Sequence, residues 1–174
     1  MREKTTLNGE GLLYYDGGLD TIQHNVNAGQ AYIHGVSLNA EALISENWSF
    51  KTSFNYTKGR NTSAGTPLGH IPPMYGQTSV AYTKDKFYVQ LLARYNAKKL
   101  VGDYDPEGSD NLDNATPDGT PAWYTLNLYA DYKANKHFSF NIAVENLLDM
   151  HYRPFSSGVS GAGRNFIVTL RGHF

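Results

Sequence analysis

Apolar and polar side chains alternate with a period of two in one segment of this chain after another. Five segments show the pattern with little ambiguity, and two more are plausible. In chain order they cover residues 31–44, 48–56, 75–84, 87–96, 124–132, 138–145 and 164–174, of which the first and the third are the plausible ones. Successive side chains of a β-strand point to opposite faces, so the pattern predicts seven strands with one apolar and one polar face each. Helical periodicity is scarce, and we therefore expect an all-β fold.

The connections between these segments alternate in length. Short turns are expected at Ser45–Asn47, Lys84–Lys86 and Ala134–Lys136, and long loops at residues 59–73, 98–121 and 147–163. This order indicates an antiparallel up-and-down meander with tight turns at one end and long loops at the other. Bacterial outer-membrane β-barrels have this asymmetry, with tight periplasmic turns and longer external loops, whereas a soluble sandwich has no reason to place every long loop at one end.

The apolar faces carry aromatic residues near the strand ends, as in the interfacial girdles of membrane barrels. The opposite faces hold polar side chains, which suit either bulk water or a wet lumen. No apolar run is long enough for a membrane helix, and the mean hydropathy of -0.48 is typical of soluble proteins. Barrel strands escape such averages, so alternation alone leaves a membrane barrel and a soluble β-protein equally open. The aromatic positions are Trp48, Tyr56, Phe87, Tyr95, Tyr124, Tyr132 and Phe138.

Composition excludes several classes of function. The chain has 15 basic and 16 acidic residues, which argues against a nucleic-acid partner. It has no cysteine, which excludes a disulfide framework, a thiolate metal site and a cysteine nucleophile. No arrangement typical of a nucleophilic triad, a carboxylate pair or a phosphate loop stands out, so we predict no enzymatic activity, no cofactor and no metal site. No apolar run follows Met1, so we see no secretory signal, and an exported protein would need further residues before it.

Seven strands do not close a bacterial barrel, because such barrels have an even number of strands and lipid does not tolerate unpaired strand edges. Either an eighth strand lies within residues 1–29 or the chain is part of a larger barrel. The first 29 residues are rich in turn formers, and we expect them to form an external loop region, with the barrel strands in residues 30–174.

Three motifs, in the expected order, resemble those of TonB-dependent outer-membrane receptors. Residues 144–154 read VENLLDMHYRP and are followed by a serine- and glycine-containing loop, by Gly163–Phe166 (GRNF) and by a terminal phenylalanine. Residues 67–76, PLGHIPPMYG, and residues 27–36, NAGQAYIHGV, resemble two strand starts of the same family. Together the motifs extend over residues 27–174, which makes the resemblance specific.

The resemblance implies a transmembrane barrel of about 22 strands with an N-terminal plug. This chain would supply about the last seven strands, without the plug. Such receptors lie in the bacterial outer membrane and take up a scarce nutrient, such as a ferric siderophore, haem, cobalamin or a glycan. The implied partners are outer-membrane lipid and lipopolysaccharide, the remainder of the receptor, the barrel-assembly machinery, and TonB through the missing N-terminal part only.

The resemblance also implies roles for five residues. Phe174, at the end of the last strand, would act as a signal to the assembly machinery. Asn146, Asp149, Tyr152 and Arg164 are motif positions, for which we expect structural rather than ligand-binding roles. Asn and Asp commonly cap the free backbone groups of a loop, and Arg164 is placed to pair with Asp149.

Four loop residues are candidate contacts to an external ligand: His70, Asp103, Asp105 and His151. The segment from Asp103 to Gly108 resembles the start of a calcium loop. However, a proline interrupts it and its twelfth position is an asparagine, so we expect a solvated acidic loop without a metal. The six histidines lack metal-ligand spacing.

Two alternatives remain open. The first is a stand-alone eight-stranded structural or adhesin barrel, in which residues 5–17 supply the missing strand and Leu7–Tyr15 pairs between the first and last strands. The second is a soluble β-sandwich binding module with the Tyr and Phe faces packed in a dry core.

Overall fold

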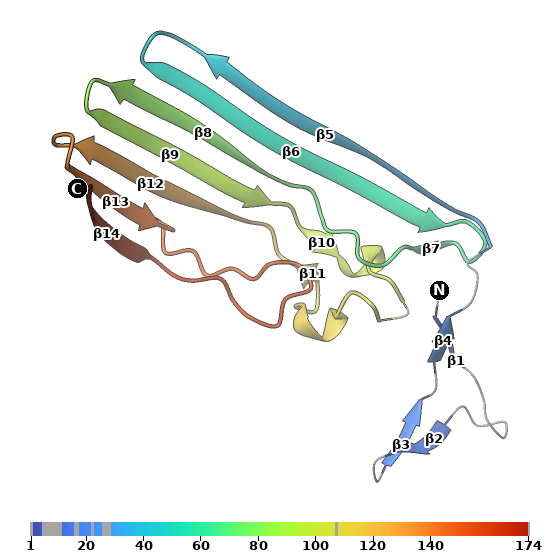
Figure 1. Ribbon diagram of the computed structural model, residues 1–174. Coiled ribbons are helices and arrows are strands. Elements are labelled where there is room, and N and C mark those ends of the chain that lie inside the picture. Colours follow the sequence, from blue (N-terminus) through green and yellow to red (C-terminus); the bar gives the residue numbers. More distant parts are fainter. Residues whose placement is uncertain are drawn as a thin grey trace.

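The computed structural model describes residues 2–4, 12–15, 18–21, 23–25, 29–106 and 108–173. Its main feature is one antiparallel sheet with the predicted seven long strands, paired in chain order (Figure 1). The short strand β7 (Thr66–Pro67) adds to β6 as an eighth member. The long strands are β5 (Ala31–Leu43), β6 (Trp48–Asn61), β8 (Tyr75–Lys84), β9 (Phe87–Asn96), β12 (Trp123–Lys133), β13 (Phe138–Glu145) and β14 (Asn165–Gly172).

The short turns lie at one end of the sheet and the long loops at the other, as predicted (Figure 1). In the turn between β8 and β9, Asp85 adopts a φ of 51°, a conformation that aspartate tolerates better than most residues. In the turn between β12 and β13, the Asn135 side-chain oxygen accepts hydrogen bonds from the amides of His137 and Phe138, at 2.8 and 3.0 Å. Local side-chain chemistry thus closes the turns.

The burial pattern is the inverse of that of a soluble protein. The apolar face is open, with Val168 76% and Leu91 46% exposed. The polar face is the more buried one, where Thr125 and Asn127 are 3% and 5% exposed. Only two hydrophobic residues are buried in the part of the chain that the structure describes, and they are Ala81 and Tyr104. The sheet therefore presents its apolar side outward, as a strand wall facing hydrocarbon does.

Register makes the apolar face continuous across the sheet. Directly paired residues form one apolar row that consists of Phe50, Val80, Leu91, Leu128, Val144 and Phe166. Aromatic pairs stand at the turn end of this face, where the ring centroids of Trp48 and Tyr82 are 5.0 Å apart and those of Phe87 and Tyr132 are 4.6 Å apart. Trp48, Phe87 and Tyr132 are predicted girdle positions at this end, to which the structure adds Tyr82. No second sheet packs on this face among the described residues, which disfavours the soluble sandwich.

The first and last long strands have only one neighbour each within the described part of the chain: β5 pairs with β6, and β14 with β13. The N-terminal region forms two small separate sheets, in which β1 (Arg2–Lys4) pairs with β4 (Gln23–Asn25) and β2 (Leu12–Tyr15) with β3 (Gly18–Thr21). Residues 12–15 thus do not bridge β5 and β14, which disfavours the eight-stranded alternative. The remainder of the proposed eighth strand, residues 5–11 and 16–17, lies outside the described residues.

The loop end is more regular than the sequence pattern predicts. β6 continues to Asn61, beyond the expected end at Tyr56, because Ala31 of β5 still pairs with Asn61. The long loop after β9 contains four short elements instead of an irregular chain. They are β10 (Lys99–Leu100), η1 (Val101–Asp103), η2 (Leu112–Asn114) and β11 (Gly119–Thr120), of which β10 and β11 pair. Neither η1 nor η2, the helices of the described residues, is long enough to cross a bilayer.

Candidate functional site

A buried ion pair lies where the three long loops converge. The Lys99 Nζ is 3.0 Å from an Asp110 carboxylate oxygen, and the two side chains are 5% and 0% exposed. The remaining described ion pairs, Lys51–Glu41 and Lys58–Asp103, are largely exposed. Burial of both charges strips them of water, so each must be satisfied by protein groups.

Those groups come from all three loops. The Asp110 carboxylate accepts hydrogen bonds from the backbone amides of His70, at 2.6 Å, and Asp105, at 3.1 Å. The Lys99 ammonium donates to the carbonyl of Ile71 at 2.6 Å and lies 4.1 Å from the centroid of the Phe155 ring. The pair therefore joins the loops over residues 62–74, 97–122 and 146–164, and we call it the loop hub.

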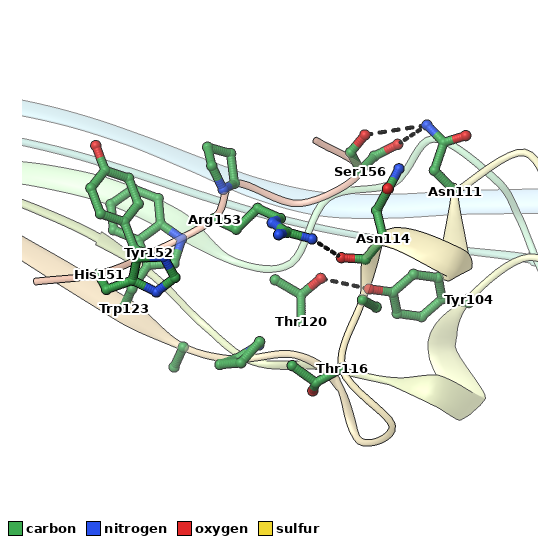
Figure 2. Close-up of a pocket in the computed structure, with 14 residues that line it drawn as sticks. Tyr104, Asn111, Asn114, Thr116, Thr120, Trp123, His151, Tyr152, Arg153 and Ser156 are labelled. Carbon is green, nitrogen blue, oxygen red and sulfur yellow. Dashed lines mark hydrogen bonds between the residues drawn. The ribbon is translucent and has the colours of Figure 1, made fainter. Parts of the chain in front are cut away.

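A pocket of about 210 Å³ opens beside the loop hub, between the second and third of these loops (Figure 2). One wall is held by the Tyr104 hydroxyl, which lies 2.5 Å from the Thr120 hydroxyl. Across the pocket, an Arg153 guanidinium nitrogen donates to the Asn114 carbonyl at 2.8 Å. The Asn111 amide also crosses, to the Ser156 carbonyl at 3.2 Å and to the Ser156 hydroxyl at 2.9 Å. Direct hydrogen bonds between the two loops thus fix the shape of the pocket.

The chemistry of the pocket favours a ligand with hydrogen-bond acceptors and an apolar body. None of its lining residues is acidic, while Arg153 and His151 are basic. The rings of Trp123 and Tyr152 form the apolar part, with centroids 4.4 Å apart. The Trp123 indole Nε1 is buried and has no hydrogen-bond partner among the described residues. A buried donor without an acceptor is unfavourable, so a ligand that reached this atom with an acceptor would satisfy it.

The four predicted ligand contacts do not form one cluster. His151 lines the pocket, with its Nε2 3.3 Å from the Ser160 hydroxyl. His70 contributes its backbone amide to the loop hub, at a φ of 61°. Asp105 also gives its amide to the hub, while its carboxylate accepts a hydrogen bond from Ser109. Asp103 is 3.7 Å from Lys58 on the surface. Within the described chain no three His, Asp or Glu side chains gather as metal ligands do.

Asn146 is the best-connected of the four motif residues. It adopts a φ of 48° and is 3% exposed. Its amide nitrogen donates to the carbonyls of Met150 and Ala162, at 2.9 and 3.0 Å, and its side-chain oxygen accepts from the Met150 amide at 2.9 Å. Its backbone amide donates to the Asn127 side chain at 3.0 Å. The Asn146 side chain thus ties the start of the third loop to its end, and the Asn146 backbone amide ties it to the sheet.

The other motif residues close the same loop. The Asp149 carboxylate accepts the backbone amide of Arg164 at 2.7 Å, while the Arg164 Nε donates to the Leu147 carbonyl at 3.0 Å. Asp149 and Arg164 therefore meet through the arginine backbone. The Tyr152 ring lies on Gly161, where any Cβ would collide with it. Phe174, the predicted assembly signal, lies outside the described residues.

Sequence reasoning missed the residues that organise this end of the molecule. The composition of the acidic loop predicts solvation, but Asp110 is fully buried because the amides of two loops and Lys99 surround it. The sequence pattern also does not single out the pocket residues Trp123 and Arg153. One sequence signal could have indicated Trp123. It is an aromatic residue at the loop end of a strand face that is otherwise polar, in line with Thr125.

Comparison with known protein families gives a match over residues 5–147 to the family described as TonB dependent receptor-like, beta-barrel. Among curated proteins, the pesticin receptor of Yersinia enterocolitica is 29% identical over 143 residues, which are 79% of this chain and 20% of that protein. The pesticin receptor of Yersinia pestis is 29% identical over 134 residues, 74% of this chain and 19% of that protein. The chain thus spans about one fifth of the length of these relatives.

Solved structures share the fold at low sequence identity. The copper transporter OprC aligns with a TM-score of 0.74 and 22% identity, over 94% of this chain and 26% of that one. The ferric-catecholate import receptor Fiu from E. coli K12 aligns with a TM-score of 0.62 and 19% identity, over 91% and 22%. The ferric yersiniabactin uptake receptor FyuA from Yersinia pestis aligns with a TM-score of 0.58 and 18% identity, over 83% and 24%.

Proposed function

Because the chain belongs to the TonB-dependent receptors of the bacterial outer membrane, we propose that it forms part of the barrel wall of a receptor that takes up a scarce nutrient. Energy for uptake would come from TonB, acting through a plug that the barrel encloses. The observation that carries the proposal is the inverted burial pattern of the sheet. Apolar side chains are exposed on one face and polar side chains are sheltered on the other. In a closed barrel these faces meet lipid and a watery lumen.

The two outer strands of the sheet supply the second part of the proposal. In lipid, every backbone amide and carbonyl needs a partner, so the free edges of β5 and β14 must pair with further strands. We propose that the remainder of the receptor provides these strands. The barrel-assembly machinery would insert the protein with the aid of Phe174, and lipopolysaccharide would surround the loop end.

We propose a ferric siderophore as the transported ligand. The names of several structural relatives support this class, because Fiu, FyuA and the ferric enterobactin receptor of Pseudomonas aeruginosa are all described as binding or importing ferric ligands. The alignment with the copper transporter OprC supplies a second candidate cargo, copper. The pocket of Trp123, His151 and Arg153 would contribute contacts to the ligand, and the four motif residues would hold its loop in place.

A receptor chimera tests the function. Residues 31–174 replace the corresponding C-terminal barrel segment of the Yersinia pesticin receptor, in a host that lacks its own ferric siderophore receptors. We expect an outer-membrane barrel with heat-modifiable migration on gels, and uptake of radioactive ferric siderophore that stops when TonB is deleted. A chimera that remains unassembled, or uptake that does not depend on TonB, would contradict the proposal. Uptake of copper in place of iron would select the second cargo.

The pocket is tested in the same chimera. Trp123→Phe removes the unpartnered indole donor, and Arg153→Gln removes the positive charge. Each should raise the ligand concentration for half-maximal uptake by about tenfold, the effect of one lost charged or buried hydrogen bond. Arg60→Gln is the matched control, because Arg60 lies in β6, outside the pocket lining, where its guanidinium donates to the Gly65 carbonyl. If Arg60→Gln raised this concentration equally, the pocket would not be a specific contact for the ligand.

A further inference from the structure

The near-zero net charge of the chain conceals a strong polarity along the sheet. The loop over residues 97–122 contains six acidic residues and two lysines, whereas two of the turns at the opposite end are basic and the third, between β5 and β6, carries Glu46 and no lysine. The turn between β8 and β9 and the turn between β12 and β13 carry four lysines and a single acidic residue, Asp85. The lysines are Lys84, Lys86, Lys133 and Lys136, and all four are exposed.

The two basic turns are adjacent in space. The Lys86 ammonium donates to the Ala134 carbonyl at 2.8 Å, and the Lys133 amide donates to the Lys86 carbonyl at 2.9 Å. None of the four lysines forms an ion pair within the described part of the chain. Four positive charges are thus concentrated on two neighbouring turns, where one acidic residue, Asp85, partly offsets them. We call these four lysines the basic rim.

The basic rim borders the aromatic girdle of the apolar face. Phe87 and Tyr132 stack directly inside it, and they are 56% and 37% exposed. Lys84 pairs with Phe87 in the register of the sheet, which places both side chains on the lipid-facing side, whereas Lys133 follows Tyr132 and extends from the opposite face at the edge of the rim. Aromatic rings at this position mark the boundary between hydrocarbon and headgroups. A lysine one step further out reaches the depth of the lipid phosphates, with its methylene stem along the apolar surface.

We propose that the basic rim binds anionic phospholipids of the periplasmic leaflet through their phosphate groups, while the Phe87–Tyr132 stack packs against the glycerol and upper acyl chains. Charge complementarity selects this partner, because anionic headgroups attract lysines clustered beside a membrane segment. Only the placement of the chain in the barrel wall is required, and the identity of the transported ligand is not. A failed transport assay would therefore leave this inference standing.

Native mass spectrometry of the assembled chimera measures lipid retention directly. The chimera is incubated with equal amounts of phosphatidylglycerol and phosphatidylethanolamine of identical acyl chains. We expect phosphatidylglycerol to be retained preferentially, and the preference to fall by about fivefold for each lysine removed in Lys84→Gln and Lys86→Gln. Raised salt should weaken it as well, because the lysines are exposed and their charges are screened.

Two variants make the result decisive. Lys58→Gln with Lys98→Gln removes the same charge from exposed lysines at the loop end, and this control should keep the preference. Lys84→Arg with Lys86→Arg keeps the charge, and should also keep it. Only heat-modifiable barrels are compared, so misfolded protein does not enter the measurement. Equal retention of the two lipids by the unmodified chimera, or an equal loss in the control, would overturn the inference.

Discussion

The strand wall and the loop hub handle burial in opposite ways. In the wall, apolar residues such as Leu91 are exposed and polar residues such as Asn127 are sheltered. In the hub, charged groups are enclosed by protein, with Asp110 at 0% exposure. The wall follows a two-residue rule that repeats along every strand, while the hub depends on particular contacts between distant segments. The stability lost on substitution in the wall should therefore depend on which face of the sheet the residue occupies. In the hub, it should depend on which buried partner loses its interaction.

Breaking the loop hub should have the largest effect. Asp110→Asn keeps the shape of the side chain but leaves the Lys99 ammonium buried without its counter-charge. Removal of one partner of a buried pair costs about 3–5 kcal/mol. We expect hydrogen exchange in residues 97–122 to rise by orders of magnitude while β9 and β12 stay protected.

The double variant Lys99→Met with Asp110→Leu is the matched comparison, because it removes both charges and fills the space with apolar side chains. Such replacements are often neutral or stabilising. Protection of the loop should return only in part, because the amides of His70 and Asp105 lose their acceptor. If the single and the double variants were equally disordered, the charge imbalance would not be the cause.

A charge on the wall should separate the two faces. Leu91→Arg places a cation at the middle of the lipid-facing side of β9, which costs about 2–4 kcal/mol. Gln90→Arg places the same side chain one residue away, on the polar face, and should assemble almost normally. The fraction of heat-modifiable barrel against denaturant concentration measures both. Equal destabilisation by the two arginines would mean that the faces do not differ in environment.

Asn146 combines a left-handed backbone with four hydrogen bonds, so its replacement should have an intermediate effect. Asn146→Ala loses the side-chain bonds and is strained at a φ of 48°, a total of about 2 kcal/mol. Asn146→Gly loses the bonds without the strain, and should recover part of the loss. Protease cleavage between residues 146 and 164 is the readout. If Asn146→Gly were cleaved faster than Asn146→Ala, the left-handed backbone conformation would not contribute to the loss.

The exposed pair of Lys58 and Asp103 should contribute least. Its atoms are 3.7 Å apart and its side chains are 56% and 47% exposed. Exposed pairs are screened by water and salt, and Lys58→Gln should change stability by less than about 0.5 kcal/mol. The same denaturation assay measures it. A loss as large as that of Asp110→Asn would show that burial does not set the difference between the two pairs.

The difference between the strand wall and the loop hub also explains which parts of the structure can be predicted from the sequence. All seven long strands, their turns and their apolar faces follow from local alternation, because side-chain direction in a strand is fixed by the backbone. Alternation predicts the end of β6 too early, because Thr57–Gly59 lacks alternation and the strand continues through backbone pairing with β5. The loop hub has no local signal. Lys99 and Asp110 carry no spacing rule, and their burial depends on Ile71 and Phe155 from two other loops.

Cysteine scanning of β9 tests the inverted sheet most directly, because the chain has no native cysteine. Single cysteines at Val89, Gln90, Leu91 and Leu92 are exposed to a water-soluble maleimide in the assembled receptor after the plug is released by denaturant. We predict labelling at positions 90 and 92 and protection at 89 and 91. Leu92 is decisive, since it is apolar but lies on the polar face opposite Ser79. Protection at 92 together with labelling at 91 would contradict the account.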